Sequence, residues 1–65
     1  MQPHEERVVV EKRELDEKIT KLKTFLDSST FNELSYDDRS LLENQHTCMK
    51  QYSFILGKRI ERFNK

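Results

Sequence analysis

The 65-residue sequence contains little of what several protein classes require. Its one cysteine, Cys48, excludes an internal disulfide, and its cysteine and two histidines do not have the spacing of a zinc site. One glycine and one proline are too few for a collagen-like or low-complexity chain, and an apolar content of 34% is too high for a disordered one. No apolar run exceeds three residues, as in Val8–Val10, so no segment is expected to cross a membrane.

Net charge is also missing, because twelve Lys and Arg balance twelve Asp and Glu. Broad nucleic-acid binding needs a basic excess and is not expected. The N-terminus lacks the basic flank and apolar stretch of a signal peptide, so we expect a cytoplasmic location. A single glycine cannot build a glycine-rich phosphate loop, and no catalytic or metal-binding cluster is visible. We therefore expect neither an enzyme nor a bound cofactor or metal.

Two long segments of helical periodicity are present, and together they predict an all-α fold with one domain over residues 1–65. The first helix is predicted over about residues 4–26, after Pro3, which favours the first helical position. Its apolar residues recur at alternating spacings of three and four, and Lys12 interrupts them. These apolar residues are Val8, Leu15, Ile19, Leu22 and Leu26.

A linker is predicted over residues 27–35, with a short helical turn at about 30–34 that tucks Phe31 and Leu34 over the core. Ser35 is typical of a helix N-cap, and the second helix is predicted over about residues 36–63. Gly57 inside that helix costs about 1 kcal/mol relative to alanine, which indicates a close backbone approach at this point. The predicted fold is a two-helix antiparallel hairpin.

The apolar face of the second helix is wider than one hairpin contact requires. Leu41, Cys48 and Ile55 form one line, and Leu42, Met49 and Leu56 form another beside it. Because fully burying one Leu side chain contributes about 1.5–3 kcal/mol, exposed lines of this kind favour association. We expect a homo-oligomeric helical bundle, with Cys48 as a small core residue. The alternative is a monomer in which Phe31 and Leu34 cover the rest.

Three polar or aromatic side chains, Gln45, Tyr52 and Arg59, lie seven residues apart on the second helix. One interpretation is structural: Arg59 pairs with Glu5 or Glu11, and Gln45 fixes the register. The other is a pocket between subunits, in which Tyr52 stacks on a flat ring, Arg59 holds a phosphate and Gln45 bonds a base edge. Lys12 either joins this pocket or extends its charged end to solvent at the bundle edge.

The antiparallel hairpin also brings two basic segments to one end. Lys58, Arg59, Arg62 and Lys65 then lie near the start of the first helix, which contributes His4 and Arg7. Free backbone N–H groups at a helix start attract anions. Arg7 and Arg62 are therefore added to the predicted ligand-binding residues.

The chain resembles a family of short bacteriophage proteins first labelled from a crAss-like phage. The residues that carry the resemblance are Glu5-Glu6-Arg7, Glu14-Leu15, Ile19, Leu22, Phe25, Leu26, Phe31, Leu34, Leu41-Leu42, Gln45, Met49, Tyr52, Leu56, Arg59-Ile60 and Phe63. The resemblance implies a phage or prophage origin and a two-helix fold. Phage accessory proteins of this size often counter host defence, and some are oligomeric sponges for nucleotide signals.

These observations lead to two hypotheses about function. The first is an anti-defence protein in the host cytoplasm that sequesters a small anionic, nucleotide-like immune signal in pockets between subunits. The alternative is a helical protein–protein interaction module that inhibits or scaffolds a host or phage protein.

Overall fold

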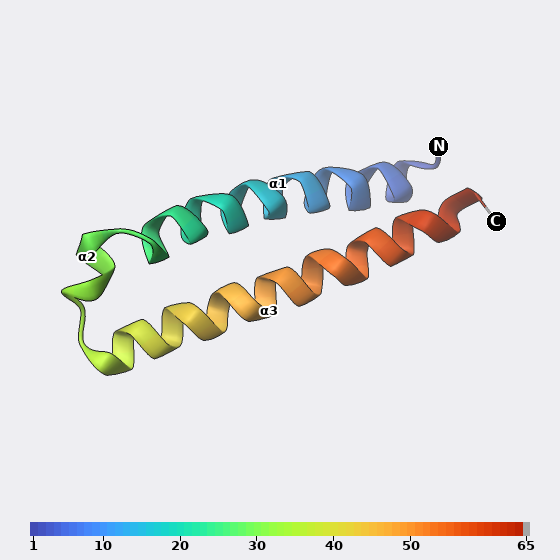
Figure 1. Cartoon of the computed structure of the whole chain (residues 1–65). Helices are drawn as coiled ribbons and strands as arrows, with labels where there is room; N and C mark the ends of the chain where they lie inside the picture. Colours follow the sequence, from blue (N-terminus) through green and yellow to red (C-terminus); the bar gives the residue numbers. More distant parts are fainter. Residues whose placement is uncertain (65) are drawn as a thin grey trace.

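The protein is an all-helical hairpin, as the sequence predicts. The computed structural model describes residues 1–64, and Lys65 of the predicted basic group lies outside the described residues. Helix α1 spans Pro3–Leu26, the short helix α2 spans Ser29–Asn32, and helix α3 spans Tyr36–Glu61. A 3-10 helix, η1, follows at Arg62–Asn64. The helices α1 and α3 lie side by side and antiparallel, with both ends of the chain at the same end of a rod that measures 47 × 14 × 14 Å (Figure 1).

Short polar side chains define the starts of the helices. The backbone N–H of Gln2 donates to Glu5 Oε1 at 2.8 Å in front of α1, and Pro3 occupies the first helical position. Ser28 Oγ accepts from the N–H of Phe31 in α2, and Ser35 Oγ accepts from the N–H of Asp38 in α3, at 3.2 Å. The predicted N-cap at Ser35 is thus confirmed, and it satisfies a donor that the helix itself leaves free.

The linker turns the chain around a pair of aromatic rings. The short helix lies at Ser29–Asn32, slightly before the predicted turn at 30–34, because Ser28 caps it. Phe31 is buried and meets the ring of Phe25 edge-on, with centroids 6.2 Å apart and an interplanar angle of 78°. This geometry is one that aromatic pairs prefer. It closes the hairpin at the end opposite to the termini.

The end of α3 differs from the predicted boundary near residue 63. The α-helix stops at Glu61, and the chain tightens into η1, which carries Arg62 and Phe63. Backbone N–H groups at the C-cap bond to the carbonyls of Arg59 and Ile60. Such tightening is common in the last turn of an α-helix, where carbonyl groups lack their usual partners.

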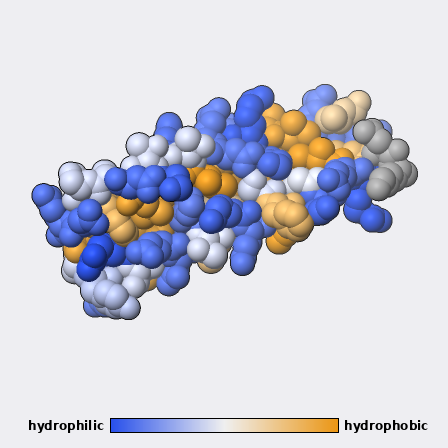
Figure 2. Space-filling model, in the orientation of Figure 1, coloured by the Kyte–Doolittle hydropathy of each residue, from blue (hydrophilic) through white to orange (hydrophobic). Residues whose placement is uncertain are grey.

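The core is one narrow stripe between α1 and α3. Leu56 is 0% exposed, and Val8 of α1 is also buried. Cys48 is exposed in the single hairpin, so it is not a core residue within one chain. Successive helical residues differ by about 100° in direction, so only one of the two apolar lines of α3 can face α1. The line that contains Leu56 packs against α1, and the line that contains Cys48 lies outside the contact. Figure 2 shows the consequence, apolar patches interspersed with charged side chains over the surface.

Neither long helix has the length of apolar sequence that a membrane span requires, among the residues that the structure describes.

We predict that Leu56→Ala lowers the free energy of unfolding by about 2–5 kcal/mol, because it leaves a cavity at the most buried position. Phe54→Ala, two residues away, is the matched control: Phe54 is 65% exposed, and its loss should cost less than about 1 kcal/mol. Urea denaturation followed by circular dichroism measures both values. Equal effects would contradict the assignment of the core stripe.

Candidate functional site

Tyr52 is the best-defined residue of the predicted line. Its hydroxyl donates a hydrogen bond to Oε2 of Glu11 across the hairpin, and the side chain remains 42% exposed. This hydrogen bond raises the pKa of Tyr52 above 10.0, because the Glu11 carboxylate favours the protonated phenol, whereas the positive charge of Arg59 opposes the shift. Tyr52, Glu11 and Arg59 therefore form one electrostatically coupled group.

Arg59 and Gln45 lie at the surface on either side of Tyr52 along α3. The Gln45 side-chain amide donates to the sulfur of Met49 at 3.8 Å. Within residues 1–64, the ion pairs join neighbours on the same helix and none includes Arg59. The structural interpretation, in which Arg59 pairs with Glu5 or Glu11, is therefore not what the structure shows.

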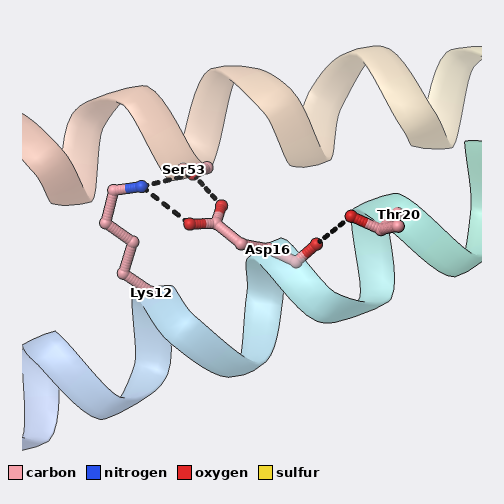
Figure 3. Close-up of polar contacts among 4 residues, drawn as sticks. All are labelled: Lys12, Asp16, Thr20 and Ser53. Atoms are coloured by element: carbon pink, nitrogen blue, oxygen red, sulfur yellow. Dashed lines mark hydrogen bonds and ion pairs between the residues drawn. The ribbon is translucent and has the colours of Figure 1, made fainter.

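Lys12 has a different set of contacts, which Figure 3 shows. Its Nζ donates to Asp16 Oδ2 at 2.8 Å and to Ser53 Oγ at 3.1 Å, and the Ser53 hydroxyl donates to Asp16 Oδ1 at 2.5 Å. We call these three residues the polar triad. It joins α1 to α3 in the middle of the hairpin, so Lys12 is held by the fold instead of simply extending to solvent.

The polar triad shifts the titration of its acid. The pKa of Asp16 lies below its usual 3.8, first because of the hydrogen bond from Lys12 and next because of the one from Ser53. Each of these donors stabilises the carboxylate over the carboxylic acid.

Gly57 is explained by the same region. A Cβ atom at this position would lie 3.2 Å from Cε of Lys12, closer than ordinary van der Waals contact. The sequence suggested a close backbone approach at Gly57, but the group that lies there is the side chain of Lys12. The absence of a side chain here leaves room for the stem of Lys12 to reach Asp16 and Ser53.

The predicted ligand-binding residues Lys12 and Arg7 line two different open grooves. A groove of about 420 Å³ contains Lys12 and is lined by Val9, Lys12, Arg13, Asp16, Glu17, Thr20 and Ile60. A second groove of about 480 Å³ contains Arg7 and is lined by Pro3, Glu6, Arg7, Val10, Glu11 and Glu14. The second groove adjoins the Tyr52 group through Glu11, whereas the first does not share a residue with it.

Arg7 and Arg62 lie at the end of the hairpin where the chain begins and ends (Figure 1). Three glutamates line the groove of Arg7, so this groove alone does not favour an anion. Lys58 turns the other way: its Nζ lies 5.3 Å from the centroid of the Phe54 ring and 3.6 Å from Glu61 Oε2. The basic side chain whose charge acts on Tyr52 is that of Arg59.

The fold and this surface define a class of protein: a small helical hairpin that presents an exposed aromatic and polar line on one helix. The sequence matches the Sequestin family over residues 2–62, and the chain belongs to that family. No curated protein and no solved structure was found to be similar to it.

The sequence interpretation named Glu11 as a possible partner of Arg59, whereas the structure pairs Glu11 with Tyr52. It missed Asp16 and Ser53 as the partners of Lys12. A signal for Ser53 was present, because it occupies a core-facing position between Met49 and Leu56 at helical spacing. A polar residue there needs a partner from the other helix, and Lys12 is the polar interruption of that helix. No comparable signal pointed to the pairing of Glu11 with Tyr52, because Glu11 lies outside the apolar periodicity.

We predict that Asp16→Asn lowers the free energy of unfolding by about 1 kcal/mol at pH 7, a modest value because the carboxylate is half-exposed. A lowered folded-state pKa gives stability that is present above the unfolded pKa and is lost as pH falls through the folded value. The difference from the wild type should therefore shrink below pH 4. Urea denaturation at pH 7 and pH 2.5 measures it, with the neighbouring Glu17→Gln as control; a difference independent of pH would contradict the ionised triad.

Proposed function

We propose that this protein binds and sequesters a small anionic, nucleotide-like ligand without transforming it. The name of its family suggests a sequestering function. The observation that carries the ligand class is the exposed ring of Tyr52 beside Arg59, whose guanidinium makes no ion pair within the described residues.

The residue types in this group suit the parts of a nucleotide. The exposed face of Tyr52 offers an area on which a base stacks, and Arg59 offers a planar fork of donors for a phosphate. The Gln45 amide supplies a donor and an acceptor for a base edge. Glu11 repels phosphate, so the phosphate is placed toward Arg59 and the nucleoside toward Glu11.

The same group gives roles to the other predicted residues. Arg62 follows Arg59 by about one turn and extends the positive surface for a second phosphate. Arg7 contacts the ligand only if its attraction to the phosphate is stronger than its attraction to the three glutamates of its own groove. Lys12, held in the polar triad, supports the fold beneath the site and contributes its charge from a distance.

The grooves of a single hairpin are open to solvent, and an enclosed ligand site needs residues from another chain. We therefore place the ligand between subunits of a homo-oligomer, as the wide apolar face of α3 favours. The resemblance to short phage proteins gives the setting: the ligand is a nucleotide immune signal in the host cytoplasm, and its removal blocks the host defence.

A thermal-shift panel of cyclic dinucleotides, cyclic trinucleotides and ADP-ribose derivatives tests this function. At a hundredfold excess over the dissociation constant, a true ligand should raise the melting temperature by more than about 5 °C. Arg59→Gln should abolish the rise, because it removes the phosphate contact while leaving an exposed surface. Arg13→Gln, an exposed arginine on α1, is the matched control and should keep it. No response to any compound of the panel would overturn the proposal.

A second candidate function is a helical protein–protein interaction module that inhibits or scaffolds a host or phage protein. It is favoured by a depression of about 640 Å³ on the outer surface of α3, lined by Thr47, Lys50, Gln51, Phe54 and Ile55. Exposed aromatic and aliphatic side chains of this kind anchor protein interfaces. Pull-down from host lysate separates the two: a stoichiometric protein partner lost in Phe54→Ala favours the module, and a co-purifying nucleotide favours sequestration.

A further inference from the structure

One line of α3 remains uncovered along the length of the helix. Leu41 is 67% exposed and Ile55 is 53% exposed, and Cys48 between them is exposed as well. These three residues are spaced by seven, so they lie on one side of the helix, and Tyr52 lies on the same side. We call Leu41, Cys48, Tyr52 and Ile55 the outer stripe. It has the spacing of a coiled-coil seam, and no segment within residues 1–64 covers it.

The total surface of the chain indicates how much is left to cover. The accessible surface is 5196 Å², whereas a compact monomer of 7.9 kDa exposes ~4,400 Å². The excess of about 800 Å² is spread over the elongated rod, and it is comparable with the area that each partner loses in a typical specific interface. A second chain could therefore cover one face without leaving too little surface to water.

The charges at the two ends of α3 specify the partner and its direction. Asp37 and Asp38 lie in the first turn, and Arg59 and Arg62 lie at the end. Another copy in the parallel direction would place like charges side by side. An antiparallel copy places the acidic end of one α3 beside the basic end of the other, twice by symmetry. At 100° per residue, Asp37 and Arg62 also lie on the same flank of the outer stripe.

We propose that a second copy of this chain covers the outer stripe, with the two α3 helices antiparallel. With the twofold axis near the middle of α3, Cys48 lies beside the partner's Tyr52 and Leu41 beside the partner's Arg59. This inference rests on the proposed function in one respect. The line of Gln45, Tyr52 and Arg59 borders the outer stripe, so the partner's α3 supplies the second wall of the ligand site.

Sedimentation equilibrium of the full chain tests the interface. The wild type should have twice the mass of one chain at micromolar concentration. Ile55→Glu should raise the dimer dissociation constant at least tenfold, because it places a charge among the apolar residues of the outer stripe. Phe54→Glu changes a neighbouring exposed apolar residue that lies outside the outer stripe, and it should change the dissociation constant less than twofold. A monomeric wild type, or a dimer that Ile55→Glu leaves intact, would overturn the proposal.

Charge reversal tests the direction of the pairing. Asp37→Arg and Arg62→Asp should each weaken the dimer about fivefold, since each turns two attractive contacts into repulsive ones. The double variant should restore the wild-type dissociation constant, because opposite charges again face each other. In a parallel pair the single variants would not weaken association, and that result would overturn the antiparallel arrangement. Circular dichroism of each variant verifies that α3 remains helical.

The two proposals fail in different ways. A dimer with these properties that ignores every compound of the nucleotide panel retains the interface and overturns the sequestering function. Nucleotide binding by a protein whose mass is insensitive to Ile55→Glu retains the function and overturns the interface.

Discussion

Two helices joined as a hairpin share one line of contact, and this limit shapes the molecule. Only one stripe of α3 can face α1, and Leu56 marks it as the most buried residue of the structure. Side chains of α3 that lie more than about a quarter-turn from that stripe remain exposed to solvent. The exposed Leu41, Cys48 and Ile55 and the exposed line of Gln45, Tyr52 and Arg59 are both consequences of this geometry. The surface that is available for binding is the surface that the hairpin has no means to bury.

The contact itself is unusual in having a charged centre. The polar triad of Lys12, Asp16 and Ser53 occupies the place where an apolar residue would give more burial, and Gly57 leaves space for it. A network of this kind contributes less stability than a packed apolar core, but its hydrogen bonds are satisfied in one alignment of the helices only. A shift of α3 by one turn would leave Lys12 without Ser53. The triad therefore fixes the register, and the register sets Tyr52 opposite Glu11.

The sequence was sufficient to predict those elements that depend on neighbours along the chain. The helical segments and the cap at Ser35 follow from periodicity and local backbone chemistry. The contacts between the helices did not follow in the same way. Glu11 could pair with Arg59 or with Tyr52, and the directions of the side chains across the hairpin decide that it pairs with Tyr52. Periodicity likewise shows which residues share a line and not which line faces the other helix, so it did not reveal that Cys48 lies outside the contact within one chain.

The distribution of charge along α3 has two explanations that do not compete. Acids in the first turn and bases in the last stabilise the helix dipole within one chain, and this accounts for Asp37, Asp38, Lys58 and Arg59 without any partner. The dipole, however, sets no requirement for apolar residues. The exposed seam between an acidic and a basic end is an independent observation, and the proposed antiparallel copy accounts for the seam and the charges together. In that proposal the same partner encloses the ring of Tyr52, so that assembly and ligand binding would depend on a single face of one helix.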